Sequence, residues 1–212
     1  MSILLPVPAD ARVRRVAQLY AGLALYGFST ALLVNSDLGL DPWDVFHQGL
    51  AERIGIKIGI ATVVTSALVM LFWIQLRQRP GVGTISNAIV IGLVVDAVLT
   101  FLPDPDAIAP RSVFLASGIV LNGIATGMYI GAGLGPGPRD GLMTGWAARS
   151  GRTIRLVRTL IEVAVLIVGW FLGGTVGVGT AAYALAIGPL AHIFIPLFTI
   201  GRAEPIADLE GH

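Results

Sequence analysis

The sequence contains no cysteine and few charged residues. Only 13% of its 212 residues are Asp, Glu, Lys or Arg, whereas a soluble domain averages about a quarter. The absence of cysteine excludes disulfides, thiolate metal sites and cysteine nucleophiles. The three histidines, His47, His192 and His212, are scattered and have no zinc-binding spacing. No serine nucleophile motif or paired-carboxylate motif stands out either, so we expect no enzyme, no metal and no cofactor.

Hydrophobic residues are what the sequence has in abundance. They make up 55% of the chain, and the mean hydropathy is +0.80. Several apolar stretches reach about twenty residues, the helical length that crosses a bilayer. The run at 16–34 is longer than the core of a signal peptide, so we interpret it as the first transmembrane helix. The composition predicts an all-α integral membrane protein whose partner is the lipid bilayer, with no nucleic-acid partner.

The chain is an internal duplication. A shift of 96 residues aligns 15–102 with 111–198 without a gap and brings glycines, prolines and aspartates into register. "LGLDPWD" at 38–44 returns as "LGPGPRD" at 134–140, and "GVGT" at 81–84 returns at 177–180. Shared membrane composition alone would not align residues that break helices or carry charge. Because "GVGT" lacks the lysine of a phosphate-binding loop, we expect it to form turns between helices.

Each repeat predicts three spanning helices with one short helix between the first and second spans. The expected spans are 14–36, 58–77, 84–102, 111–132, 154–173 and 179–200, and the short helices are 42–54 and 138–150. Small residues at every fourth position of 27–39 and 123–135 predict that the first and fourth spans cross closely.

The number of crossings sets the predicted topology. Three crossings per repeat invert the second repeat relative to the first. With the N-terminus inside, only Arg53, Lys57 and Arg111 of the 14 basic residues fall outside, which is the bias that the positive-inside rule describes. We therefore predict a cytoplasmic N-terminus (1–13), repeat 1 (14–104), repeat 2 (105–200) and a cytoplasmic tail (201–212).

The repeated turn is the predicted substrate site. Its recurring positions are Gly39 and Gly135, Pro42 and Pro138, and Asp44 and Asp140. The glycines permit a tight turn, the prolines suit the first position of a helix, and the aspartates face the positive end of the helix dipole. Asp41 is a candidate cap of the first short helix. The turns either start two surface helices or re-enter the membrane to line a cavity, and matching interruptions in inverted repeats favour the second interpretation.

One exchange between the short helices adds two candidates. Trp43 in the first helix corresponds to Arg139 in the second. An aromatic face and a guanidinium on opposite halves could receive a small organic ion. Both residue types also anchor helices at the depth of lipid headgroups, so this alternative stays open.

Three ionisable residues lie within predicted spans, namely Asp96, Glu162 and His192. Ionisable groups at membrane depth are candidates for ion or proton coupling because they usually face a cavity or a partner. A histidine and a carboxylate can pass protons near neutral pH, and Asp96 and His192 are related by the repeat. The alternative is that each lies near a helix end or makes a structural ion pair.

The pattern "GLALYGFSTALLVNSDLGLDPWDVF", followed by "GLGPGPRDGLMTG", resembles the bacterial YczE-like membrane proteins of the YczE/YyaS/YitT group. The likeness covers about 12 to 200, and its most specific elements are the two LG-x-x-P-x-D blocks. It implies a bacterial inner-membrane location and a transport role. Genes of the group often lie near regulators that resemble pyridoxal-phosphate enzymes, which implies amine, amino-acid or vitamin-like solutes.

We therefore expect a secondary transporter of a small polar solute, with its site at the interface of the repeats and both termini cytoplasmic. Helix N-termini favour anionic groups and aspartates favour cations, so a zwitterion or an amine fits better than a simple anion. The alternatives are a passive channel and a non-transporting membrane partner or sensor subunit. The sequence leaves a homodimer open.

Overall fold

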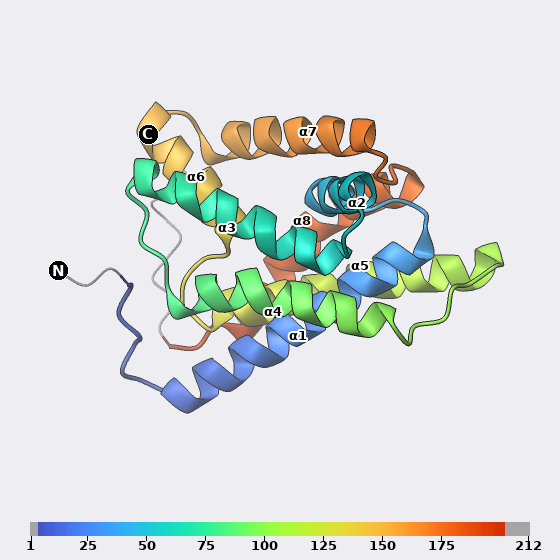
Figure 1. The fold of residues 1–212 in the computed structure, drawn as a ribbon. Helices are drawn as coiled ribbons and strands as arrows, with labels where there is room; N and C mark the ends of the chain where they lie inside the picture. The colour runs from blue at the N-terminus through green and yellow to red at the C-terminus, as the bar shows by residue number, and fades with distance from the viewer. Residues whose placement is uncertain (1–3, 202–212) are drawn as a thin grey trace.

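Residues 4–201, the part of the chain that the computed structural model describes, form eight helices and no strand (Figure 1). In chain order the helices are α1 (Arg12–Ser36), α2 (Pro42–Ile54), α3 (Ile58–Leu76), α4 (Val82–Leu99), α5 (Ile108–Gly131), α6 (Pro138–Ser150), α7 (Ile154–Leu172) and α8 (Val178–Phe198). The predicted all-α class is confirmed. Of the predicted cytoplasmic tail, all but residue 201 lies outside the described residues.

The two short helices have the predicted bounds because their start and stop signals are local. Each begins with a proline, whose missing N–H is not needed at the first helical position. Asp41 caps α2, and its carboxylate accepts the backbone N–H groups of Trp43 at 2.8 Å and Asp44 at 3.0 Å. Gly55 and Gly151 end the two helices in the left-handed conformation.

Five helices, α1, α3, α4, α5 and α8, are long and apolar enough to cross a membrane. They make the chain a multi-pass membrane protein. The predicted span at 154–173, which is α7, is not among the five. Its 19 residues include Arg155, Arg158 and Glu162, and each charge raises the free energy of insertion into lipid.

Helices α1 and α5 pack closely against each other, but through glycines outside the predicted small-residue stripes, whose own glycines Gly27 and Gly123 contact α4 and α8. A Cβ added to Gly22 of α1 would lie 2.8 Å from Met128 Cβ, and one added to Gly118 of α5 would lie 2.8 Å from Leu33 Cγ. Around this pair, α4 packs against α1 and α8 packs against α5. The short helices pack across the repeats, α2 against α7 and α6 against α3.

The repeated turns join the two halves of the chain. Gly179, at the start of α8, donates its backbone N–H to Leu38 O at 2.7 Å, and Gly83, at the start of α4, donates to Leu134 O at 2.8 Å. The "GVGT" blocks therefore form the first turns of α4 and α8, each against the turn of the other repeat. Gly39 and Gly135 lie in these turns, outside the cavity lining described below.

A cavity between the two repeats

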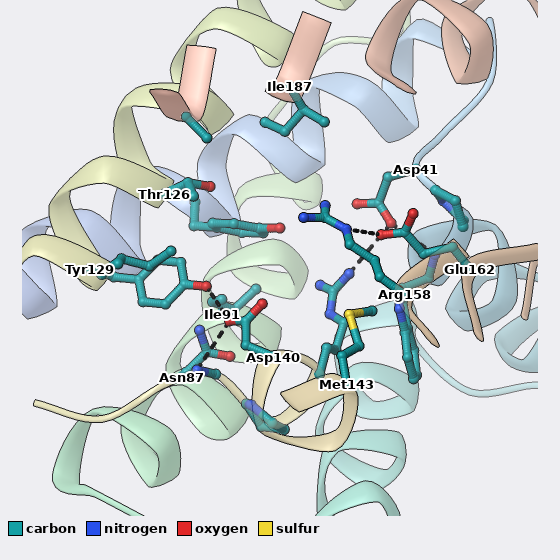
Figure 2. Close-up of a pocket in the computed structure, with 18 of the residues that line it drawn as sticks. Asp41, Asn87, Ile91, Thr126, Tyr129, Asp140, Met143, Arg158, Glu162 and Ile187 are labelled. Atoms are coloured by element: carbon teal, nitrogen blue, oxygen red, sulfur yellow. Dashed lines mark hydrogen bonds and ion pairs between the residues drawn. The ribbon is translucent and has the colours of Figure 1, made fainter. Parts of the chain in front are cut away.

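A cavity of about 170 Å³ lies where the starts of α2 and α6 meet α7 and α8 (Figure 2). Both repeats contribute to its wall. The charged residues that line it are Asp41, Arg139, Asp140, Arg158 and Glu162, and the aromatic ones are Tyr26, Trp43, Tyr129 and Tyr183. Aliphatic side chains, Ile91 and Ile187 among them, complete the lining. The cavity thus combines charges of both signs with aromatic and apolar surface.

Asp41 is the most deeply buried carboxylate of this lining, since only 2% of the residue is exposed. Its Oδ1 accepts the two N–H groups that it caps and lies 3.4 Å from Arg139 Nη1. Its Oδ2 has no hydrogen-bond partner among residues 4–201. A buried acceptor without a donor is costly, and this one belongs to a residue of the cavity lining.

Sequence reasoning assigned Asp41 only a capping role. A difference between the repeats could have pointed to Asp41, because the second repeat has Gly137 at the corresponding position. A glycine can start a helix there without a carboxylate.

Asp140 lies in the cavity lining, where the sequence predicted a binding aspartate. Its Oδ2 accepts the hydroxyl of Tyr129 at 2.6 Å and the backbone N–H of Gly137 at 3.2 Å. The predicted prolines Pro42 and Pro138 also line the cavity. Asp140 is half-buried, and its hydrogen bonds hold it in one orientation toward the cavity.

Asp44 does not line the cavity. It lies between α2 and α3, with 2% of the residue exposed. Its Oδ1 is 3.2 Å from Nδ1 of His47, and the same nitrogen is 3.2 Å from Thr62 Oγ1. The two aspartates that the sequence placed in one site are therefore in different surroundings, one at the cavity and one in a buried polar cluster.

Trp43 and Arg139 face each other at the cavity. The guanidinium carbon of Arg139 lies 5.7 Å from the centre of the Trp43 ring, within the range of a cation–π interaction. Only 5% of Trp43 is exposed. The pair is therefore a contact between the two short helices, and the ion over the aromatic face is the protein's own guanidinium.

Of the three candidates for ion or proton coupling, only Glu162 lies at the cavity. Its Oε1 accepts Arg158 Nε at 2.9 Å (Figure 2). Asp96 accepts the backbone N–H of Gly59 at 2.7 Å and thereby joins the start of α3 to α4. His192 is exposed on α8. The structure does not bring these three residues together.

Residues 13–196 match a family of unknown function, DUF6198. The chain belongs to this family. It is 38% identical to an uncharacterized protein of Haemophilus influenzae over 185 residues, which are 87% of this chain and 85% of that protein.

Two Bacillus subtilis proteins carry the expected YczE likeness, which is confirmed. The chain is 32% identical to the uncharacterized membrane protein YczE, over 84% of this chain and 83% of YczE. It is 26% identical to the uncharacterized protein YyaS, over 83% and 90% of the two chains. No solved structure matches.

Proposed function

We propose that this protein is a secondary transporter of the bacterial inner membrane that carries a small amine, amino acid or vitamin-like solute through the cavity between its repeats. The observation that best supports the proposal is Oδ2 of Asp41. This buried carboxylate oxygen has no partner among the described residues and belongs to a residue of the cavity lining. The starts of both short helices meet there, as in transporters whose inverted repeats share one central site.

The charges of the lining favour a solute with a cationic group. Three carboxylates and two guanidinium groups line the cavity. Arg158 and Glu162 pair with each other, and Tyr129 donates to Asp140. Asp41 pairs with Arg139 through Oδ1, so its Oδ2 is the oxygen left to bind an ammonium group, while Arg139 can donate to the carboxylate of a zwitterion.

The proposal includes six spans and an inverted second repeat. In it α7 is also a span, the fifth along the chain, because Arg158 and Glu162 face the cavity and neutralise each other, while Arg155 lies in the first turn and can extend to the headgroups. Both termini are then cytoplasmic, and nine of the 14 basic residues lie on that side, apart from Arg139 and Arg158 in the cavity.

Ligand binding is the first test. Purified protein is screened by thermal shift against amines, amino acids, vitamins and simple carboxylates, as wild type and as Asp41→Asn, Asp140→Asn and Asp44→Asn. A ligand at a hundred times its Kd stabilises the native state by about 2.7 kcal/mol. We expect an amine or zwitterion to stabilise wild type and Asp44→Asn but not Asp41→Asn. Asparagine caps helices about as well as aspartate, so that variant keeps its fold.

Flux into proteoliposomes separates the functional alternatives. A carrier gives flux of the bound solute that saturates and follows a gradient. Flux that rises without saturation would favour a passive channel, and binding without any flux would favour a sensor or partner subunit. If no compound shifts the wild type, or if all four proteins shift equally, the cavity is not the binding site.

A further inference from the structure

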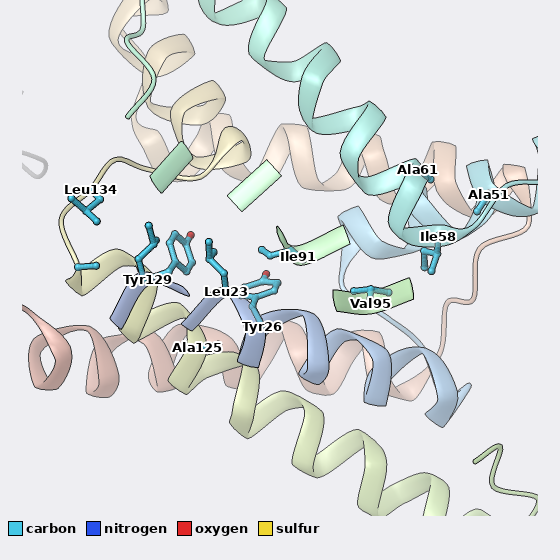
Figure 3. Packing of buried hydrophobic residues seen from close by; sticks show 12 residues of the cluster. Leu23, Tyr26, Ala51, Ile58, Ala61, Ile91, Val95, Ala125, Tyr129 and Leu134 are labelled. Atoms are coloured by element: carbon cyan, nitrogen blue, oxygen red, sulfur yellow. The ribbon is translucent and has the colours of Figure 1, made fainter. Parts of the chain in front are cut away.

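Helices α3 and α4 are in close contact at the end of the bundle where α3 begins. Gly59 and Gly92 approach so closely that a Cβ on either residue would overlap the carbonyl oxygen of the other. The hydrogen bond from Gly59 to Asp96 lies beside this contact. Ile58 of α3 and Val95 of α4 belong to the hydrophobic cluster shown in Figure 3. This side of the molecule is closed.

The corresponding helices of the second repeat, α7 and α8, do not make this contact. Gly188 is the repeat counterpart of Gly92, and a Cβ added to it would meet no atom of another described helix within 4 Å. In an apolar 18-residue stretch of each helix, 44% of the residues of α4 are buried, whereas only 6% of those of α8 are buried. The pairs α3–α4 and α7–α8 are thus in different states, although they are built from related sequence.

The cavity lies on the open side. Arg158 and Glu162 line it from α7, and Gly188 and Ala191 line it from α8. The Arg158 side chain is 55% exposed, and Gly188 is exposed. The cavity therefore reaches the surface between α7 and α8, while the close contact of α3 and α4 covers the related position in the first repeat.

We propose that the two repeats exchange these arrangements. In a second state α7 closes on α8 at Gly188, α3 moves away from α4, and the cavity opens toward the opposite face of the membrane. The inference rests on the proposed transport function, which requires the solute to leave on the other side. Inverted repeats make such an exchange possible because each half can adopt the packing that the other half shows.

One difference between the repeats makes the two states unequal in population. The counterpart of Gly59 in the second repeat is Arg155, so the closed contact of α7 with α8 has one glycine where that of α3 with α4 has two. His192 takes the place of Asp96 as the acceptor opposite the start of α7. The second contact is wider than the first, and the state with α3 and α4 closed is therefore the more populated.

Single introduced cysteines test the exchange, because the natural chain contains none. Val95→Cys and Ala191→Cys are repeat counterparts. Val95 is 1% exposed under α3, whereas Ala191 lines the cavity. In nanodiscs, a water-soluble maleimide should modify Ala191→Cys rapidly and Val95→Cys slowly, at a rate set by the population of the second state.

The test of the exchange combines Gly188→Val with the labelled variant Val95→Cys. In the described state no other helix occupies the space around the new side chain, so the expected loss of stability is limited to the local strain of a β-branched residue before Pro189 in α8. In the second state the side chain would overlap α7. We expect the labelling of Val95→Cys to slow about fivefold or more, as the minor population falls. The matched control is Ala181→Val, because position 181 and its repeat counterpart Ile85 are both exposed. Labelling at the same rate with and without Gly188→Val would overturn the inference.

A cross-link gives an independent measurement. Cysteines at Arg155 and His192 replace the counterparts of Gly59 and Asp96, which touch in the first repeat. Mild oxidation should join them, whereas the pair Arg155→Cys with Ala181→Cys should not react. Absence of the first cross-link would contradict the exchange.

The two proposals can fail separately. A solute that protects Ala191→Cys from the maleimide shows binding in the cavity whether or not the repeats exchange. If the solute protects Ala191→Cys but the cross-link does not form, the exchange is wrong and the cavity remains a binding site. If the cross-link forms but no compound of the panel binds, the exchange holds and the proposed solute class is wrong.

Discussion

Residues 42–54 and 138–150 form short helices of equal length that begin at a proline and end at a left-handed glycine. The aspartate in the first turn of each helix nevertheless has different surroundings. Asp44 is buried beside His47, whereas Asp140 lines the cavity and accepts from Tyr129. Equal backbone signals thus produced equal helices, and the neighbouring helices decided what each carboxylate contacts.

The same contrast extends to the third helix of each repeat. Thr62 of α3 is buried and shares a polar cluster with His47. Its counterpart in α7 is Arg158, whose side chain is more than half exposed and pairs with Glu162. A threonine can be buried with one hydrogen bond, whereas an arginine needs water or several acceptors. The charged side chains of α7 are therefore favourable on the exposed side, where Arg158 and Glu162 line the cavity.

The largest expected effect is at the close contact between α3 and α4. Gly92→Val places a side chain against the carbonyl oxygen of Gly59, and overpacking of this kind costs about 3 kcal/mol. Gly188→Val, at the related position, should cost less, because only local strain against the following Pro189 opposes it. Reversible unfolding in mixed detergent micelles measures both. Similar losses would show that the two sides are packed alike.

Substitutions of the glycines in the repeated turn should lower the free energy of unfolding equally in both halves. Gly39 and Gly135 have φ values of +115° and +116°, and a Cβ there would lie 2.7 Å from Thr180 Oγ1 or 3.0 Å from Thr84 Oγ1. Alanine at either position should cost about 1–3 kcal/mol because of backbone strain. The same unfolding assay checks this, and a loss confined to one repeat would contradict a shared structural role.

Tyr129→Phe tests how much the hydrogen bond to Asp140, which Asp44 lacks, contributes to stability. It removes the donor at 2.6 Å from Asp140, a hydrogen bond to a charged group, and should cost about 1.5 kcal/mol. Tyr20→Phe is the matched control, because Tyr20 is exposed and its hydroxyl lies 3.1 Å from a serine hydroxyl. Equal, small losses in both variants would show that the Asp140 contact contributes little to stability.

The smallest expected effect concerns the ion pair of α7. Glu162→Gln removes the charge that faces Arg158 four residues away, and such partly exposed pairs contribute about 0.5 kcal/mol or less. The unfolding assay should therefore barely change. Binding of a solute found by the thermal-shift screen is the sensitive readout, since the variant leaves Arg158 unpaired in the cavity. A large loss of stability would instead indicate a structural role for the pair.

The helices were predictable because their signals act over a few residues. The expected short helices agree with α2 and α6 at both ends, and the expected third and seventh helices each exceed α3 and α7 by one residue. The span at 84–102 is less accurate, since α4 runs from Val82 to Leu99. There the hydroxyl of Thr84 accepts the N–H of Gly81 and starts the helix earlier, a cap that the hydropathy pattern does not show.

The site was less predictable, because it depends on contacts between distant parts of the chain. The sequence pointed to the starts of the two short helices, which do line the cavity. It did not show that Asp41 would line the cavity while Asp44 lies under α3, since the two residues are close together in one short stretch. Which of them faces the cavity depends on the packing of α2 against α3 and α7.

By itself, the sequence determined the membrane class, the duplication and the bounds of most helices. These follow from hydropathy and from hydrogen bonds and φ preferences within a few residues. The tertiary structure alone decided that α3 closes on α4 while α7 stays apart from α8, and that one of two related aspartates reaches the cavity. Helix packing depends on the side chains of every neighbour at once, and the two repeats differ in those side chains even where their turns agree.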